Sequence, residues 1–203
     1  MKILAIMGSS RKNKNTHKLL DIFKKRVVKE KDEYKEVILK DLKFSGCISC
    51  YGCAKKPFCI VKDDLTEVYK DIEEADMIIL ATPIYFNSLS GLAKNFVDRT
   101  QVYWCRKYIL KLPPIKEKIG VALINGGAPR QEHQFTGSEL VLDHFFKVTS
   151  CKKHSIVEID NTDEYPINEE NEKIMELLDK VDYDFKENRI YRLWGGEITS
   201  EIE

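Results

Sequence analysis

The chain has 203 residues, of which 43% are hydrophobic and 33% are charged, so it is long enough to bury the core of one α/β domain. Its 33 basic and 33 acidic residues balance to a formal net charge of +0, which favours neither nucleic acid nor an anionic membrane as a partner. The sequence shows no long apolar span and no cleavable signal pattern, so we expect a cytoplasmic protein whose six cysteines are thiols or metal ligands.

Short apolar runs alternate with amphipathic stretches along the chain. The runs predict strands and the stretches predict helices, from periods of 2 and 3.6 residues. Expected strands cover residues 3–7, 34–40, 77–81, 119–124 and 155–159. Expected helices cover residues 16–29, 67–74, 92–103, 137–146 and 168–185. This alternation favours a doubly wound α/β fold, with five parallel strands and helices on both faces.

One domain is expected over residues 1–188, with a cysteine-rich loop at residues 46–62. Residues 189–203 are more polar and irregular than a core element. We expect them to form a C-terminal surface arm, which either contacts a second subunit or packs on its own domain.

A polar loop, GSSRKNKNT at Gly8–Thr16, separates the first expected strand from the first helix. Backbone N–H groups and the positive end of the helix dipole make such a loop an anion site, and its hydroxyls and Arg11 add donors. The loop lacks the spacings G-x-x-x-x-G-K-[ST] and G-x-G-x-x-G, which excludes the usual nucleoside triphosphate and dinucleotide loops. A single terminal phosphate, as in FMN, fits it, and a plain helix-capping turn is the alternative.

Two further loops follow expected strands at the same sheet edge, where ligands of doubly wound sheets bind. The loop after the third strand is stiffened by Pro83 and offers the aromatic faces of Tyr85 and Phe86. The loop after the fourth strand is Asn125–Gly127, whose glycines permit close approach of a backbone to a flat ring. Ordinary packing and turn residues are the alternative for either loop alone.

The three loops resemble a known family. Residues 8–16, 81–99 (ATPIYFNSLSGLAKNFVDR) and 125–127 (NGG) are similar to the flavin-contacting segments of the NADPH-dependent FMN reductase superfamily. The resemblance covers about residues 1–160 and implies a flavodoxin-like sheet with strand order 2-1-3-4-5. It implies that the FMN phosphate is bound by Ser9, Arg11, Asn15 and Thr16, with Ser10 as a further hydroxyl donor. It implies that the isoalloxazine is lined by Pro83, Ile84, Tyr85, Phe86, Asn87, Asn125, Gly126 and Gly127. No catalytic acid or base is assigned, because the chemistry belongs to FMN.

Four cysteines follow the second expected strand in GCISCYGCAKKPFC, with the spacing C-x2-C-x2-C-x5-C. They are Cys47, Cys50, Cys53 and Cys59. Two-residue gaps let thiolates converge from a tight loop, and the longer gap lets the chain return with the fourth. Four thiolates suit a 4Fe-4S cluster or a structural zinc ion. Because zinc usually takes two separated pairs, the spacing favours iron-sulfur binding, with zinc or free thiols as alternatives.

The cysteine spacing is similar to that of the iron-sulfur flavoproteins, a branch of the same superfamily with a 4Fe-4S cluster beside FMN. In that family the cluster of one subunit lies near the flavin of a neighbour, which implies a homodimer or homotetramer here. Cys105 and Cys151 lie outside the motif and are expected to be buried as small apolar residues. His133 follows the Asn-Gly-Gly turn and is a candidate to approach the flavin.

Three functions are compatible with these residues. The first is an FMN-dependent oxidoreductase or electron-transfer flavoprotein in which a 4Fe-4S cluster relays single electrons to or from FMN. The second is a metal-free NAD(P)H-dependent reductase of FMN, quinones or nitro compounds. The third is a non-catalytic redox carrier or sensor that uses its cysteine loop. The partner is a small-molecule or protein electron donor or acceptor, and the donor is either NAD(P)H or a ferredoxin-type protein.

Overall fold

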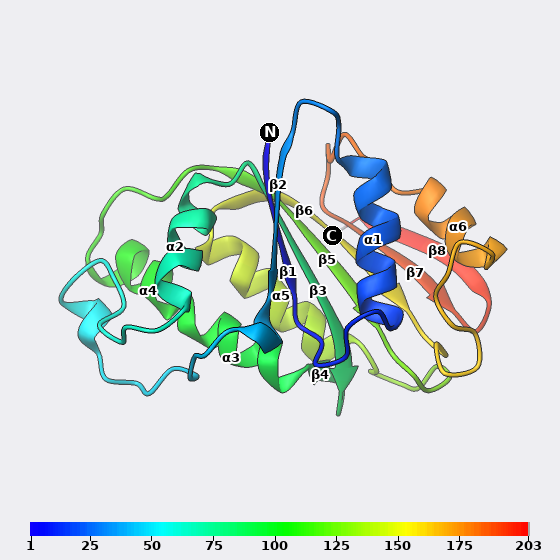
Figure 1. Ribbon diagram of the computed structural model, residues 1–203, viewed down its shortest axis with the longest axis horizontal. Helices are drawn as coiled ribbons and strands as arrows, with labels where there is room; N and C mark the ends of the chain where they lie inside the picture. The colour runs from blue at the N-terminus through cyan, green and yellow to red at the C-terminus, as the bar shows by residue number, and fades with distance from the viewer. Residues whose placement is uncertain (203) are drawn as a thin grey trace.

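The computed structural model describes residues 1–202 and has three layers, with helices on both faces of a central sheet (Figure 1). The strands are β1 (Lys2–Met7), β2 (Glu33–Ile38), β3 (Met77–Tyr85), β4 (Ser88–Leu89), β5 (Lys118–Asn125), β6 (Cys151–Ile159), β7 (Arg189–Trp194) and β8 (Glu197–Ile202). The helices are α1 (Asn15–Val27), α2 (Leu65–Glu74), α3 (Gly91–Arg99), α4 (Gln101–Trp104), α5 (Thr136–Val148) and α6 (Glu172–Asp179). Short helical turns are η1 (Leu39–Asp41), η2 (Gly52–Ala54) and the π-helical η3 (Cys105–Ile109).

The sheet has the strand order β2-β1-β3-β5-β6-β7-β8, and the short β4 pairs with the end of β3. Every neighbouring pair from β2 to β7 is parallel. Because parallel neighbours need crossovers, each connection carries the chain over one face of the sheet. The α/β fold class is confirmed. The five predicted strands correspond to β1, β2, β3, β5 and β6 and lie in the order 2-1-3-4-5, but the sheet differs in detail, because it also contains the unpredicted β4, β7 and β8.

Two apolar clusters fill the space between the sheet and its helices. On β1, Ile3 and Ala5 face α1 and α6, whereas Leu4 and Ile6 face α2, α3 and α5. Alternate residues of a strand point to opposite faces, so a fully apolar strand is buried on both sides. The central strands are therefore covered on both faces, and the loops that leave them at the sheet edge are free to bind ligands.

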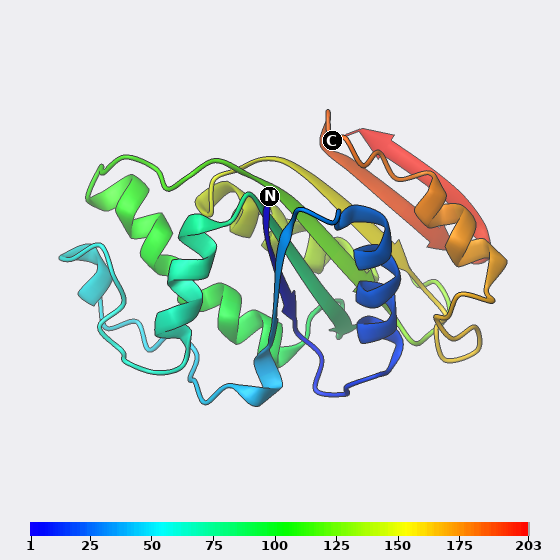
Figure 2. The ribbon, with the colours of Figure 1, turned by 45° about the horizontal axis from the view of Figure 1, so that its top comes forward.

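The C-terminal segment differs from its expected form as an irregular arm. Residues 189–202 form β7, which is parallel to β6, and β8, which is antiparallel to β7. The two strands turn at Gly195 and Gly196, whose φ angles of 56° and 82° suit a two-residue hairpin. Figure 2 shows this hairpin extending the sheet beyond the five predicted strands. Its contact with a second subunit stays a prediction.

Two expected helices also differ from the prediction. The expected helix at 92–103 is divided between α3 and α4 at Thr100, whose hydroxyl donates to the Val97 carbonyl (2.6 Å). The expected helix at 168–185 is reduced to α6, because the Asn171 side chain caps its start by accepting the Ile174 N–H (3.3 Å). Among the described residues, no helix is long and apolar enough to cross a membrane.

A buried charge network joins α5 to the C-terminal hairpin. The Arg192 guanidinium contacts three carboxylates, those of Glu158 (2.9 Å), Glu139 (3.0 Å) and Glu201 (2.6 Å). Glu158 is fully buried, and its Oε1 atom has no hydrogen-bond partner. Burial, reinforced by neighbouring Glu139, raises the pKa of Glu158 to about 9, because one cation cannot neutralise three acids.

We expect the stability of the fold to fall as the pH rises from 5 to 9. Folded Glu158 keeps its proton in this range while the unfolded chain has lost it, so stabilisation present at low pH disappears toward pH 9. One such group changes the free energy of unfolding by at most about 1.4 kcal/mol per pH unit. Denaturant titrations at several pH values should show a flatter profile for Glu158→Gln, whose amide cannot ionise, than for a Glu187→Gln control. An unchanged slope in Glu158→Gln would contradict this assignment.

Candidate functional site

The three predicted loops meet at the carboxyl edge of the sheet. The Gly8 N–H donates to the Ala81 carbonyl (2.7 Å), and the Ser90 hydroxyl donates to the Gly8 carbonyl. The Thr16 hydroxyl donates to Asn125 Oδ1 (2.7 Å). Each loop is therefore hydrogen-bonded to another, although residues up to 109 positions apart are involved.

The loop between β1 and α1 presents free donors to the solvent. The 13-residue α1 begins without a side-chain cap and has no acidic residue in its first turn. Ser10 and Arg11 are exposed, and neither side chain has a hydrogen bond or ion pair with any described residue. An uncapped helix start beside an unpaired guanidinium fits a phosphate group.

The other expected phosphate residues have side chains engaged within the protein. Ser9 is buried, and its Oγ accepts the Arg11 N–H (3.1 Å), which shapes the loop. The Asn15 amide donates to the Thr162 carbonyl (2.9 Å) and accepts the Ile167 N–H (3.1 Å). Since Asn15 and Thr16 begin α1, their backbone N–H groups remain suited to an anion.

The loop after β3 is a tight hairpin with aromatic side chains at its tip. Phe86 and Asn87 have φ angles of 49° and 58°, the left-handed pair of a type I′ turn. A bulky aromatic residue rarely adopts this conformation. The side chain of Phe86 is fully exposed, and that of Tyr85 is 52% exposed. Pro83 is buried below them, and its carbonyl accepts the Ser90 N–H (3.2 Å). The hairpin thus presents aromatic surface to a ligand at the sheet edge.

The Asn125–Gly127 turn packs closely against the chain that follows β6. The Gly126 N–H donates to the Ile159 carbonyl (2.8 Å), and the Thr162 N–H donates to the Gly126 carbonyl (3.0 Å). A Cβ on Gly127 would stand 2.5 Å from the carboxylate of Asp163, so this exposed side chain would have to move to admit it. The turn at Thr162 and Asp163 therefore supports this loop, although no local sequence pattern predicts this contact.

Gly137 and His133 also belong to the description of these loops. Gly137, at the start of α5, was not a predicted site residue, but a Cβ there would clash with the Asn87 carbonyl oxygen. His133 is exposed and lies beside Glu132 (3.3 Å). Gly137 is thus needed for the hairpin to approach α5, whereas the approach of His133 to a flavin stays a prediction.

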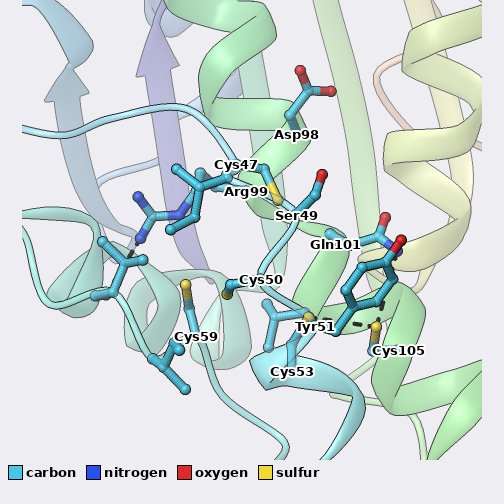
Figure 3. Close-up of a pocket in the computed structure, with 14 residues that line it drawn as sticks. Cys47, Ser49, Cys50, Tyr51, Cys53, Cys59, Asp98, Arg99, Gln101 and Cys105 are labelled. Atoms are coloured by element: carbon cyan, nitrogen blue, oxygen red, sulfur yellow. Dashed lines mark hydrogen bonds between the residues drawn. The ribbon is translucent and has the colours of Figure 1, made fainter.

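The four motif cysteines line one cavity of about 380 Å³ beside α3 and α4 (Figure 3). Cys47 and Cys50 are exposed, whereas Cys53 and Cys59 are partly buried. Among the described residues, no three of these thiols have sulfurs within 4.8 Å of one another. Tetrahedral zinc places its sulfurs roughly 3.8 Å apart, so zinc needs a tighter arrangement than this one. The cavity has the donor set for a larger thiolate-bound group.

A fifth cysteine belongs to the same cavity. Cys105, which opens the π-helical η3, is buried as expected, but it also lines the cavity. Its sulfur lies 3.4 Å from that of Cys53. Burial and the hydrogen bond with Cys105 raise the pKa of Cys53 to about 12. The expectation that Cys105 is only a packing residue missed this contact, which links positions 52 residues apart.

Arg99 holds the two ends of the cysteine loop. From the last turn of α3 its buried guanidinium forms a two-pronged ion pair with Asp63 (2.6 and 3.2 Å). The same group donates to the carbonyls of Ser45 (2.9 Å) and Val61 (3.4 Å), which flank the cysteines. Burial disfavours the charged form, but the hydrogen bonds to Asp63 and the electrostatic effects of Tyr69 and Cys59 together outweigh it, so the pKa of Arg99 lies above its usual value. The loop is therefore fixed to α3 before any ligand binds.

We expect the motif thiols to differ in reactivity when the site carries no metal. Iodoacetamide at pH 8 should modify exposed Cys47 and Cys50 first, and Cys53 at least tenfold more slowly, because its raised pKa suppresses the thiolate. Peptide mass spectrometry after timed quenching measures the order. Cys105→Ala should speed the reaction of Cys53, and the unfolded chain should show no ranking. Equal rates at Cys50 and Cys53 in the folded chain would contradict the predicted order.

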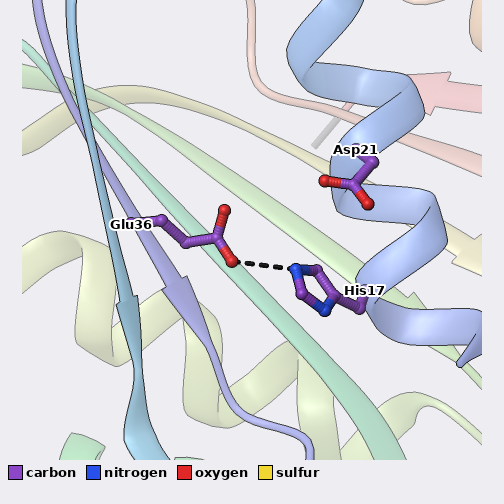
Figure 4. Close-up of side chains that lie close together, drawn as sticks. All are labelled: His17, Asp21 and Glu36. Atoms are coloured by element: carbon purple, nitrogen blue, oxygen red, sulfur yellow. Dashed lines mark ion pairs between the residues drawn. The ribbon is translucent and has the colours of Figure 1, made fainter. Parts of the chain in front are cut away.

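A second cluster of ligand atoms lies between α1 and β2 (Figure 4). Ligand atoms of His17, Asp21 and Glu36 lie within 4.8 Å of one another. His17 Nδ1 accepts the Asn13 N–H (3.1 Å), so its proton is assigned to Nε2, which lies 3.0 Å from Glu36. A metal at Nε2 would have to displace that proton. The cluster is better described as a His17–Glu36 pair that fixes Asn13 in the loop between β1 and α1.

The fold and the loops at its edge define a flavodoxin-like α/β protein. Solved structures with this fold include an NAD(P)H:quinone oxidoreductase from Methanothermobacter marburgensis (TM-score 0.63, 14% identity, covering 88% of this chain and 91% of that one). Another is an FMN-dependent NADH-azoreductase from Bacillus anthracis in complex with FMN (TM-score 0.60, 11% identity, 88% and 98% covered). At these identities the likeness concerns the fold alone.

Sequence comparison identifies the family. Residues 1–138 match the model of the NADPH-dependent FMN reductase family, so the chain belongs to that family. It is similar to an iron-sulfur flavoprotein of Archaeoglobus fulgidus, with 37% identity over 128 residues, 63% of each chain. It is also similar to an iron-sulfur flavoprotein of Methanosarcina thermophila, with 33% identity over 129 residues, 63% of this chain and 64% of that one. The chain thus spans less than two thirds of the length of these relatives.

Proposed function

We propose that the protein is an FMN-dependent oxidoreductase or electron-transfer flavoprotein whose cysteine loop carries a 4Fe-4S cluster. The observation that carries the FMN part is the meeting of three loops around an uncapped helix start. That start has no acidic residue in its first turn, and it lies beside the unpaired Arg11. Membership of the FMN reductase family and the iron-sulfur names of two relatives support the same function.

The residues divide the binding of FMN between its two ends. Arg11, Ser10 and the first N–H groups of α1 hold the phosphate, while Ser9 and Asn15 keep the loop in place. The 83–87 hairpin and the Asn125–Gly127 turn line the ring and offer backbone N–H groups to its polar edge. When bound, FMN supplies both hydride and single-electron chemistry. These residues bind and orient the flavin, and no side chain is required as an acid or base.

The cysteine loop supplies the ligands for a one-electron centre. Cys47, Cys50, Cys53 and Cys59 share one cavity, and Arg99 fixes the loop that carries them. A 4Fe-4S cluster supplies single-electron transfer when it is bound. We propose a homodimer or homotetramer, with NAD(P)H or a ferredoxin-type protein as donor and a small molecule or protein as acceptor.

Oxygen-free purification, followed by an absorbance spectrum and quantification of FMN, iron, sulfide and zinc per chain, tests this function. We expect one FMN per chain, with iron and sulfide in equal amounts. A folded chain that stays colourless with excess FMN would exclude the flavin function. Stoichiometric zinc without sulfide would exclude the cluster but leave the flavin function standing.

A metal-free NAD(P)H-dependent reductase is the second candidate, favoured by the match to the NADPH-dependent FMN reductase family. It predicts rapid bleaching of the flavin by NADPH or NADH and unchanged turnover in Cys50→Ala. The cluster function predicts that Cys50→Ala abolishes single-electron transfer to a protein acceptor. A carrier or sensor would instead show reduction by a protein donor without turnover of small acceptors.

A further inference from the structure

One polar atom beside the cysteine cavity has no partner. Of the N–H groups of Arg99, those on the two terminal nitrogens are bonded to Asp63, Ser45 and Val61. The remaining nitrogen, Nε, is buried and has no hydrogen bond with any described residue. A buried N–H without an acceptor costs about 1–3 kcal/mol, so such atoms usually have a partner that the bare chain does not provide.

The surroundings of Arg99 show what kind of partner fits. Arg99 belongs to the wall of the cavity that the four motif cysteines line, as Figure 3 shows. Its side chain is 1% exposed, so water reaches it poorly. Cys59 lies close enough to interact electrostatically with Arg99 and with Tyr69, whose hydroxyl donates to the Arg99 carbonyl (3.3 Å). These surroundings favour a partner on the cavity side of Arg99, where Cys59 lies.

We propose that Arg99 is a positioning residue of the cysteine site, whose Nε–H donates a hydrogen bond to the thiolate-bound group in the cavity. This rests on the proposed 4Fe-4S cluster and assigns it a donor outside its four ligands. Sulfur atoms of a thiolate-bound cluster carry negative charge, and they accept hydrogen bonds from N–H donors. The other N–H groups of Arg99 bind both ends of the cysteine loop. The same side chain therefore fixes the loop and donates to the group that the loop binds.

The proposed hydrogen bond from Arg99 changes the reduction potential of the cluster. A cluster gains negative charge on reduction, and donors to its sulfurs stabilise the reduced form more than the oxidised form. Arg99 therefore raises the reduction potential of the centre. A role in holding the loop alone would change the stability and the iron content of the protein but would leave the potential of a loaded site unaltered.

Arg99→Lys tests this inference, since lysine keeps the positive charge but has no Nε–H and no planar fork. Arg26→Lys is the matched control, because Arg26 also pairs with an aspartate, Asp179 (3.0 Å), on the opposite face of the sheet. The full chain is loaded with iron and sulfide without oxygen, and its midpoint potential is measured by electron paramagnetic resonance. We expect reduction of the Arg99→Lys centre to be about tenfold less favourable, which is 59 mV lower for one electron. The Arg26→Lys potential should equal that of the unaltered chain.

A second measurement needs no variant. The unaltered chain, labelled with ¹⁵N-arginine and reduced, should show a nitrogen coupling to the cluster in electron nuclear double resonance. Absence of that coupling, or an unchanged potential in loaded Arg99→Lys, would overturn the role of Arg99 while the cluster stands. Failure of the unaltered, folded chain to take up iron and sulfide would overturn the proposed cluster and this inference together. FMN content, measured in every sample, reports separately on the flavin site.

Discussion

A Cys50→Ala variant will retain FMN but lose nearly all of its iron and sulfide. Cys50 lines the cysteine cavity from an exposed position in the middle of the motif, so its loss leaves three motif ligands for a cluster that needs four. The three loops of the proposed FMN site belong to other segments of the chain, and they share no hydrogen bond with Cys50 in the described residues. Iron, sulfide and FMN are measured per chain after oxygen-free reconstitution, with about four irons expected in the unaltered protein.

Cys151→Ala is the control for this experiment. Cys151 is also a cysteine, but it is buried at the start of β6 and outside the cavity. Burial raises the pKa of its thiol to about 11, so it remains protonated and is a poor metal ligand at neutral pH. We expect Cys151→Ala to keep its iron and sulfide. If Cys50→Ala keeps the same iron and sulfide as Cys151→Ala, Cys50 is not a ligand.

An Arg11→Ala variant will bind FMN roughly 10–100-fold more weakly. Charge-assisted hydrogen bonds contribute about 1.5–3 kcal/mol each, and Arg11 has no other partner in the described chain. Lys12→Ala is the control, because neighbouring Lys12 already pairs with Asp41 (2.6 Å). The dissociation constants are measured by quenching of flavin fluorescence.

Riboflavin makes this measurement specific for the phosphate. It has the same ring as FMN but no phosphate, so its affinity should be nearly the same for Arg11→Ala and the unaltered chain. Equal losses for FMN and riboflavin would show that Arg11 shapes the loop and does not bind the phosphate. Equal losses in Arg11→Ala and Lys12→Ala would indicate a general effect of positive charge.

The fold was predictable where burial is simple. The apolar runs at 77–81 and 119–124 lie in strands covered on both faces, so hydrophobicity alone marks them. β6 begins earlier than expected, at Cys151, because exposed Lys152 and Lys153 hide its first residues from a search for apolar runs. β8 was missed for the same reason, since it is an edge strand with mostly exposed residues.

Only those residues of the candidate site that belong to a continuous sequence motif were predictable. The cysteine spacing and the three loops are continuous in sequence, and each carries its own chemistry. Cys105 and Arg99 act at the cysteine cavity through contacts across 36 to 54 residues, which spacing does not reveal. The turn at Thr162 that supports Gly126 is likewise distant. Such partners become visible only when the chain is folded.

Helix α3 connects the proposed FMN site to the cysteine site. Ser90, which caps its first turn, donates a hydrogen bond to Gly8 in the first loop of the proposed FMN site. Arg99, in its last turn, donates a hydrogen bond to Ser45 at the start of the cysteine segment. The nine residues of α3 span about 14 Å, so the length of this helix sets the distance between the Gly8 loop and the cysteine loop. The cysteine segment consequently depends on α3 for its structure. A synthetic peptide of residues 45–63 would lack the anchor that closes its ends, and transplanting the motif to another scaffold would require carrying this helix with it.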